Sequence, residues 1–254
     1  MPDVIINGPA GRIEGRYLSN SGQDAGIALI LHPHPQHGGT MNNKVVYTMY
    51  NTFARQGFSV LRFNFRGVGR SQGEFDNGEG ELSDAAAALD WLQNNNPNAK
   101  SCWIAGFSFG SWIAMQLLMR RPEIESFVSV GLPANMYDFS FLAPCPTSGL
   151  VVHGQQDTVV PKDSVEKLLK KLSHQRGINL RYEIMDHADH YFNNHLDRLS
   201  QIIEEYVQDF AKRAKAPATA RRRQPGNPRV NVQEILDTMY NDDDDTDDDA
   251  EEKN

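Results

Sequence analysis

The 254-residue sequence predicts an α/β fold in which helices cover both faces of a mostly parallel sheet. Two observations predict this class. Short runs of apolar and β-branched residues alternate along the chain with segments of helical periodicity. Most of the runs are continuously apolar, which is typical of strands buried on both faces of a sheet. With 39% hydrophobic residues, the chain is long enough to bury one sizeable core.

The apolar runs are interpreted as the strands of an eight-stranded sheet. The first two, IIN at 5–7 and GRIEGRYL at 11–18, predict an antiparallel hairpin that opens the sheet. The later runs are GIALILHP at 26–33, SVLRFNF at 59–65, SCWIAGF at 101–107, SFVSVGL at 126–132, GLVVHG at 149–154 and LRYEIMD at 180–186.

The segments that separate these runs show helical patterns. In the segment 161–175, Val165, Leu168, Leu169 and Leu172 recur at helical spacing and form one apolar stripe. Strands that alternate with such helices are connected by crossovers, which make neighbouring strands parallel. The predicted helices are 42–57, 83–95, 109–121, 161–175 and 195–215.

The composition of the chain changes at about residue 216. Residues 216–254 contain eleven Asp or Glu and five Lys or Arg, together with several prolines. Such a segment cannot bury enough apolar surface to order itself, so it predicts a disordered acidic tail. Its net charge of −6 leaves only −2 of the total −8 for residues 1–215, which we interpret as one folded domain.

One stretch of the tail, residues 231–240, is less polar. Asn231 and Glu234 have the spacing of a helix cap and its partner, and four apolar side chains fall on one side of about two turns. Two interpretations stay open: an unpaired fragment of the tail, or a short helix that folds only against the body or a protein partner.

The sequence predicts a cytoplasmic protein without a membrane segment. No apolar run reaches 18 residues, and the first residues have neither the basic nor the apolar region of a signal peptide. The two cysteines, Cys102 and Cys145, match no zinc or redox spacing and are interpreted as buried or loop thiols. Arg221 to Arg223 are only three basic residues in a tail that also holds a run of aspartates, so no nucleic-acid partner is expected.

A serine stands where an apolar run becomes an apolar helix. Ser108 is the centre of Gly106-Phe107-Ser108-Phe109-Gly110, a G-x-S-x-G pattern at a strand-to-helix junction. This pattern is typical of a nucleophile elbow, in which a strained turn projects the serine hydroxyl out of the sheet. A core built for packing alone would favour an apolar residue there. Ser108 is therefore the predicted nucleophile.

A serine hydroxyl needs a base and an acid that follow it in the chain. Asp157 lies after the run GLVVHG and is the predicted acid. MDHADHYF follows the last predicted strand and contains two histidines. We choose His190 over His187 as the base, because His190 lies one loop beyond the strand and just before the last helix.

The reaction also needs two N–H donors for an oxyanion. The first is the backbone N–H of Phe109, which follows the predicted nucleophile. The second is predicted to be the backbone N–H of His34, since Pro33 and Pro35 have none. Gly38 and Gly39 then turn this loop, before Asn42 or Asn43 caps a helix.

Three other interpretations compete with this one. His32, His34 and His37 could form a metal-dependent hydrolase site, although no carboxylate ligand lies near them in the sequence. The glycines of RGVGRSQG at 66–73 hint at a phosphate loop, but their spacing favours a loop at a pocket edge. The chain could also be a catalytically inactive fold that serves as a binding module.

The motifs together resemble those of the α/β-hydrolase fold serine hydrolases. GFSFG at 106–110, GQQDTVVP at 154–161 and ADHYF at 188–192 are similar to the elbow, acid loop and histidine loop of that family. More narrowly, residues 32–46 and 64–91 are similar to a group of small bacterial hydrolases related to the dienelactone hydrolases.

The resemblance covers about residues 3–212, the predicted catalytic domain being 1–215, and leaves the tail outside. It implies an acyl-enzyme mechanism and ester-type substrates. We predict cleavage of a small carboxylic ester or thioester, with no cofactor and no metal. The dienelactone enzymes use a cysteine nucleophile where this chain has Ser108, so their particular substrate is not implied.

The size of the substrate follows from the loop that precedes GLVVHG. Residues 133–148 are too few for a large helical lid, which predicts an open site for short or medium acyl groups. Phe107 is the predicted substrate contact, with Phe109 and the aromatic residues Tyr137, Phe139 and Phe141 as further lining.

Overall fold

The computed structural model describes residues 3–20, 22, 25–173 and 178–215. These residues form an eight-stranded sheet in the order β1-β2-β4-β3-β5-β6-β7-β8. The strands are Asp3–Gly8 (β1), Gly11–Leu18 (β2), Ile27–Leu31 (β3), Ser59–Phe63 (β4), Cys102–Phe107 (β5), Ser126–Val130 (β6), Gly149–Gly154 (β7) and Leu180–Met185 (β8). Each lies within two residues of a predicted run at both ends, which confirms the predicted α/β fold class.

One strand runs against the others. β2 pairs antiparallel with β1 and with β4, whereas every other pair in the sheet is parallel. The predicted opening hairpin is therefore confirmed. The strands β3 to β7 are buried along their whole length, as their continuous apolar runs require.

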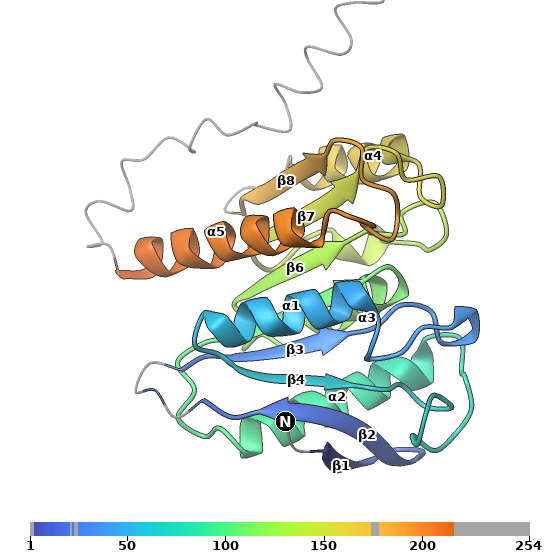
Figure 1. Cartoon of the computed structure of the whole chain (residues 1–254), viewed down its shortest axis with the longest axis vertical. Helices are drawn as coiled ribbons and strands as arrows, with labels where there is room; N and C mark the ends of the chain where they lie inside the picture. The colour runs from blue at the N-terminus through green and yellow to red at the C-terminus, as the bar shows by residue number, and fades with distance from the viewer. Residues whose placement is uncertain (1–2, 21, 23–24, 174–177, 216–254) are drawn as a thin grey trace, which may run out of the picture.

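Helices cover the sheet on both faces. The helices are Lys44–Arg55 (α1), Glu79–Asn94 (α2), Phe109–Leu118 (α3), Lys162–Ser173 (α4) and Leu196–Lys215 (α5). Figure 1 shows α1 and α5 in front of the sheet, while α2, α3 and α4 lie behind it. Each face has its own apolar cluster, because the side chains of a strand alternate between the two faces.

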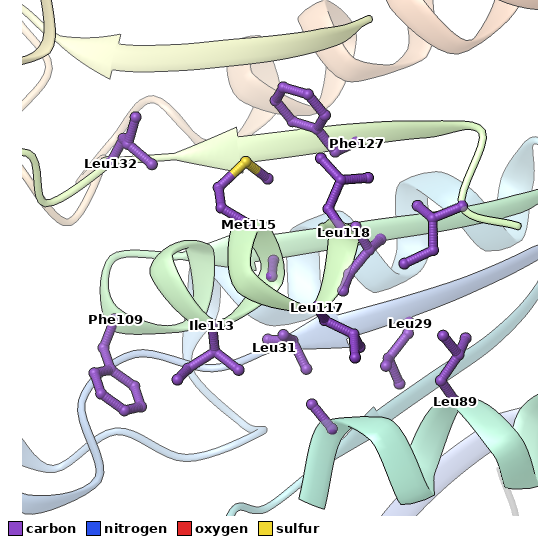
Figure 2. Packing of buried hydrophobic residues seen from close by; sticks show 14 of the residues in the cluster. Leu29, Leu31, Leu89, Phe109, Ile113, Met115, Leu117, Leu118, Phe127 and Leu132 are labelled. Carbon is purple, nitrogen blue, oxygen red and sulfur yellow. The ribbon is translucent and has the colours of Figure 1, made fainter. Parts of the chain in front are cut away.

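The cluster behind the sheet is built around α3. Figure 2 shows Ile113 and Leu117 of this helix next to Leu31 and Leu29 of β3, with Leu89 of α2 beside them. These side chains are buried, so α3 is held against the sheet along its length. A rigid α3 fixes the position of the residue that precedes it, Ser108.

Helix caps explain two helix starts. The side chain of Asn43, one of the two candidates, accepts a hydrogen bond from the Val45 N–H at 2.9 Å and so begins α1. Helix α2 begins at Glu79, four residues before the predicted start. The carboxylate of Glu81 accepts from the Gly78 N–H at 2.7 Å and from the Asp76 N–H at 3.0 Å, which stabilises the added turn.

Three further predictions concern a lid, a membrane segment and the tail. Residues 131–148, between β6 and β7, contain only one short helical turn, Ser140–Leu142, and no large lid. None of the helices in the described part of the chain has both the length and the apolarity of a membrane-spanning segment. The predicted acidic tail at 216–254, with its short helix at 231–240, lies outside the described residues.

Candidate active site

Three loops at one edge of the sheet bring the predicted nucleophile, base and acid together. Ser108, Asp157 and His190 follow β5, β7 and β8, and the carboxyl ends of parallel strands lie at the same edge. His190 Nε2 lies 3.1 Å from Ser108 Oγ, and His190 Nδ1 lies 2.7 Å from Asp157 Oδ2. Because the carboxylate accepts the Nδ1–H, Nε2 is left to accept the serine proton.

The backbone at Ser108 has the strained conformation of an elbow. Its φ of 52° and ψ of −122° lie in a region that residues other than glycine rarely adopt. The flanking glycines are required by close backbone approaches. A Cβ on Gly106 would collide with the carbonyl of Gly110, and one on Gly110 would lie 2.5 Å from the carbonyl oxygen of His32. Any side chain at these two positions would open the turn.

Asp157 is held by its own loop as an ionised acceptor. Its Oδ1 accepts hydrogen bonds from the N–H groups of Val159 at 2.9 Å and Val160 at 2.8 Å. Burial by itself would raise the pKa of Asp157, but the hydrogen bonds from His190 and Val160 lower it overall. The carboxylate is therefore charged at neutral pH and orients the imidazole of His190.

His190 is packed between two aromatic rings. Its imidazole centroid lies 5.2 Å from the ring of Phe107 and 5.4 Å from the ring of Tyr191. Phe107 has no exposed surface, whereas Tyr191 is 55% exposed. The structure thus places Phe107 buried beside the imidazole of His190, and its contact with a substrate stays a prediction.

The alternative base, His187, is directed elsewhere. It has a φ of 60°, is exposed, and its Nδ1 lies 3.4 Å from Gln156 Nε2. The structure brings His190, and not His187, to Ser108 and Asp157.

The two predicted oxyanion donors lie on neighbouring segments. Phe109 is the first residue of α3, and helix N-termini carry N–H groups without intrahelical partners. The ring of His34 lies 5.0 Å from the ring of Phe109, which brings the His34 loop against this helix start. Within the described residues, neither backbone N–H donates a hydrogen bond to another group. Both therefore stay predicted donors to an oxyanion.

The histidine cluster does not suit a metal. His32 donates from Nδ1 to the Pro33 carbonyl at 2.6 Å and accepts from the Phe65 N–H at 3.0 Å through Nε2. Both of its ring nitrogens are thus occupied, and burial lowers its pKa to about 4. The rings of His34 and His37 stack on each other at 4.4 Å. Across the part of the chain that the structure describes, no three ligating side chains gather as a metal site would require.

The loop between β4 and α2 borders the oxyanion side. Gly67, Gly69 and Gly73 all have positive φ, and the loop carries Phe75, whose ring lies 4.9 Å from His34. This loop therefore packs beside His34, and its place at a pocket edge stays a prediction.

The same loop is anchored by an ion pair that sequence reasoning missed. The guanidinium of Arg66 makes two hydrogen bonds to the buried carboxylate of Asp84, at 3.0 and 2.9 Å. Sequence spacing gives no signal for such a pair, because its members come from a loop and a helix.

The predicted aromatic lining lies beside α3. Tyr137 stacks on Trp112 at 4.2 Å and lies 5.9 Å from the buried ring of Phe109. Phe139 and Phe141 stack on each other at 5.9 Å, with Phe139 buried. Tyr137 and Trp112 are half-buried, so part of each ring is exposed. Both pack against the apolar cluster that contains Phe109, on the same side of the sheet.

Comparisons with known proteins identify sequences and structures that are similar to this chain. Residues 21–144 match the X-Pro dipeptidyl-peptidase (S15) family, a span that includes Ser108 and ends before Asp157 and His190. An uncharacterized protein of Rickettsia prowazekii (strain Madrid E) is 54% identical over 211 residues, which cover 82% of this chain and 89% of that protein.

Two solved structures resemble the whole described domain. A protein of unknown function from Agrobacterium tumefaciens, described as a candidate α/β hydrolase, is 56% identical with a TM-score of 0.81, and the alignment covers 83% of this chain and 97% of that one. A Xanthomonas campestris protein, described as an α/β serine hydrolase without a lid, is 30% identical with a TM-score of 0.75, covering 82% and 94%.

Proposed function

The chain belongs to the α/β-hydrolase fold family of serine hydrolases, and from this premise we propose that it cleaves a small carboxylic ester or thioester through an acyl-enzyme on Ser108. The observation that carries the proposal is the hydrogen-bonded series Ser108–His190–Asp157, with its distances of 3.1 and 2.7 Å. Such a series allows a neutral hydroxyl to lose its proton as it attacks.

In the first half of the proposed reaction, Ser108 Oγ attacks the acyl carbonyl carbon while His190 Nε2 takes the hydroxyl proton. Asp157 stabilises the imidazolium that forms. The N–H groups of Phe109 and His34 donate to the oxyanion of the tetrahedral intermediate. His190 then returns the proton to the departing alcohol or thiol, which leaves an acyl ester on Ser108.

In the second half, water attacks the acyl ester and gives its proton to His190 Nε2. The second tetrahedral intermediate collapses, His190 returns the proton to Ser108 Oγ, and the carboxylic acid leaves. Every proton moves between groups of this chain, the substrate and water, so the reaction needs no cofactor.

The substrate size follows from the loop between β6 and β7, which holds no large lid. We propose activity on short p-nitrophenyl esters, such as the acetate and butyrate, that falls as the acyl chain lengthens. Faster turnover of long-chain esters, with activation at lipid interfaces, would contradict an open site.

The first experiment is labelling with a fluorophosphonate, which reacts with activated serines. We expect one labelled residue, Ser108, and no label on the Ser108→Ala variant. Ser129→Ala is a matched control, because Ser129 is another buried serine whose hydroxyl has no partner among the described residues. A folded protein that takes up no label and cleaves no ester would favour the inactive binding module.

A second candidate is cleavage of an amide bond. The match of residues 21–144 to the X-Pro dipeptidyl-peptidase family favours it, and the same three side chains would serve. Glycyl-prolyl p-nitroanilide assayed beside p-nitrophenyl butyrate separates the two candidates. Release of nitroaniline at a kcat/KM above that for the ester would reverse our preference.

A further inference from the structure

A second histidine lies beside the candidate acid and takes no part in the proposed reaction. His153 is in β7 and has no exposed surface. Its Nε2 lies 3.0 Å from the carbonyl oxygen of Val160 and 3.8 Å from Asp157 Oδ2. A carbonyl oxygen only accepts, so Nε2 carries the proton and donates it to Val160. Burial lowers the pKa of His153, which keeps the ring neutral.

Packing alone does not explain this histidine. With its proton on Nε2, the other ring nitrogen, Nδ1, is a buried acceptor, and it has no hydrogen-bond partner within the described residues. An unpaired buried acceptor costs free energy that an apolar side chain of similar size would avoid. The contact that the ring does make must therefore account for its presence.

That contact reaches the candidate acid through one residue. Val160 donates its N–H to Asp157 Oδ1 at 2.8 Å and accepts from His153 through its carbonyl. The peptide groups on both sides of Val160 are thus fixed, one by the acid and one by the histidine. With Oδ1 held by this turn, Oδ2 is the oxygen that faces His190.

We propose that His153 is a positioning residue for the acid: its Nε2–H holds the Val160 carbonyl, and the turn that results fixes Asp157 toward His190. The inference rests on the proposed function. The neutral state of the ring is part of this role. A charged His153 would place a second cation 3.8 Å from Asp157 Oδ2, in competition with His190.

The test compares two variants of nearly equal shape. His153→Gln keeps an N–H donor and is neutral at every pH, whereas His153→Met has no donor. Tyr182→Phe is the control, because it removes a buried hydroxyl without a described partner from the neighbouring strand β8. Melting temperatures confirm that each variant is folded.

The readout is the rate of fluorophosphonate labelling of Ser108 as a function of pH. For His153→Met we expect a rate lowered by about 10-fold or more, since small displacements of catalytic groups cost factors of this size. The acid limb of its rate–pH profile should move to lower pH, because an Asp157 that is no longer held by this turn stabilises the charged form of His190 less. The glutamine variant and the control should stay within about threefold of the wild type.

The outcomes separate this inference from the proposed function. Absence of labelling in the wild type would overturn the proposed function itself. Normal labelling of the wild type, with equal rates and an unmoved acid limb in His153→Met, would overturn only the role of His153. If the methionine variant does not fold, the glutamine variant decides: a folded His153→Gln that has lost its labelling overturns the role, and one that keeps it supports the role.

Discussion

Two buried histidines, His32 and His190, lie at the same edge of the sheet and have different chemistry. Both rings are almost fully buried, and both use their two nitrogens in hydrogen bonds. The partners of His32 are the main-chain groups of Pro33 and Phe65, which neither release nor take up a proton at neutral pH. The partners of His190 are a carboxylate and a hydroxyl.

The comparison shows that burial does not identify a catalytic histidine. A ring between two peptide groups has a fixed tautomer and joins two segments of chain, here the end of β3 and the residues after β4. A ring between an acid and a hydroxyl can gain a proton on one side while the other side stabilises the charge. The kind of partner, and not its number, separates the structural histidine from the candidate base.

The largest expected effect is on activity. His190→Gln should lower kcat for p-nitrophenyl butyrate by at least about 10³-fold, since glutamine cannot take the serine proton. Its free energy of unfolding should change little beside that of a His32 variant. Steady-state kinetics and urea unfolding measure the two quantities on one sample. A His190→Gln enzyme with nearly full kcat would mean that His190, like His32, is not the base.

The second effect is on the pH dependence of stability. The folded-state pKa of His32 is about 4, below its ordinary value of 6.5, so between these limits the unfolded chain takes up a proton that the native state excludes. The contribution of neutral His32 to the free energy of unfolding is complete above pH 6.5, and it falls by about 3 kcal/mol as the pH drops to 4. His32→Gln does not titrate. Urea unfolding at several pH values should therefore give it a flatter curve than the wild type, and parallel curves would refute a neutral, buried His32.

A third effect follows from removing the hydrogen bonds of His32 at neutral pH. His32→Leu leaves the Phe65 N–H buried and unpaired, which should cost about 1–3 kcal/mol of unfolding free energy. Thermal and urea denaturation at pH 7.5 measure this loss. Tyr182→Phe serves again as a control, because its buried hydroxyl has no partner to lose among the described residues. Equal stability of the two variants would mean that the hydrogen bonds of His32 contribute little to the free energy of unfolding.

The smallest effect is expected from the tail. Deletion of residues 216–254 should leave kcat/KM within about twofold of the full chain, since both histidines and all their partners precede this segment. Kinetics of the shortened chain measure it directly. A large fall in activity would mean that the tail reaches the site, and hydrogen exchange over residues 231–240 would then locate the contact.

The periodicity of the sequence was sufficient for most of the fold. Apolar runs locate the strands because buried parallel strands need them. The order nucleophile, acid, base along the chain predicted Ser108, Asp157 and His190 in loops at the ends of these strands. The early start of α2 was not predicted. It depends on Glu81, whose carboxylate caps backbone groups through a geometry that apolar spacing does not describe.

Other features of the site depend on which face of a strand a residue occupies. Phe107 directly precedes the nucleophile in the sequence, and its buried side chain packs against the ring of His190. His153 lies inside the run GLVVHG, where nothing in the local pattern indicates that its ring faces the turn of Asp157. Such contacts join segments far apart in the chain, so only the assembled sheet reveals them.

The distances along the chain between the site residues bear on how the protein is made. His190 is 33 residues from Asp157 and 82 from Ser108, and it precedes only the last helix of the domain. During synthesis the elbow therefore leaves the ribosome long before the candidate base, and a nascent chain that ends before β8 holds Ser108 without His190. If the proposed function holds, we expect hydrolytic activity only after almost the whole domain has been made and has folded.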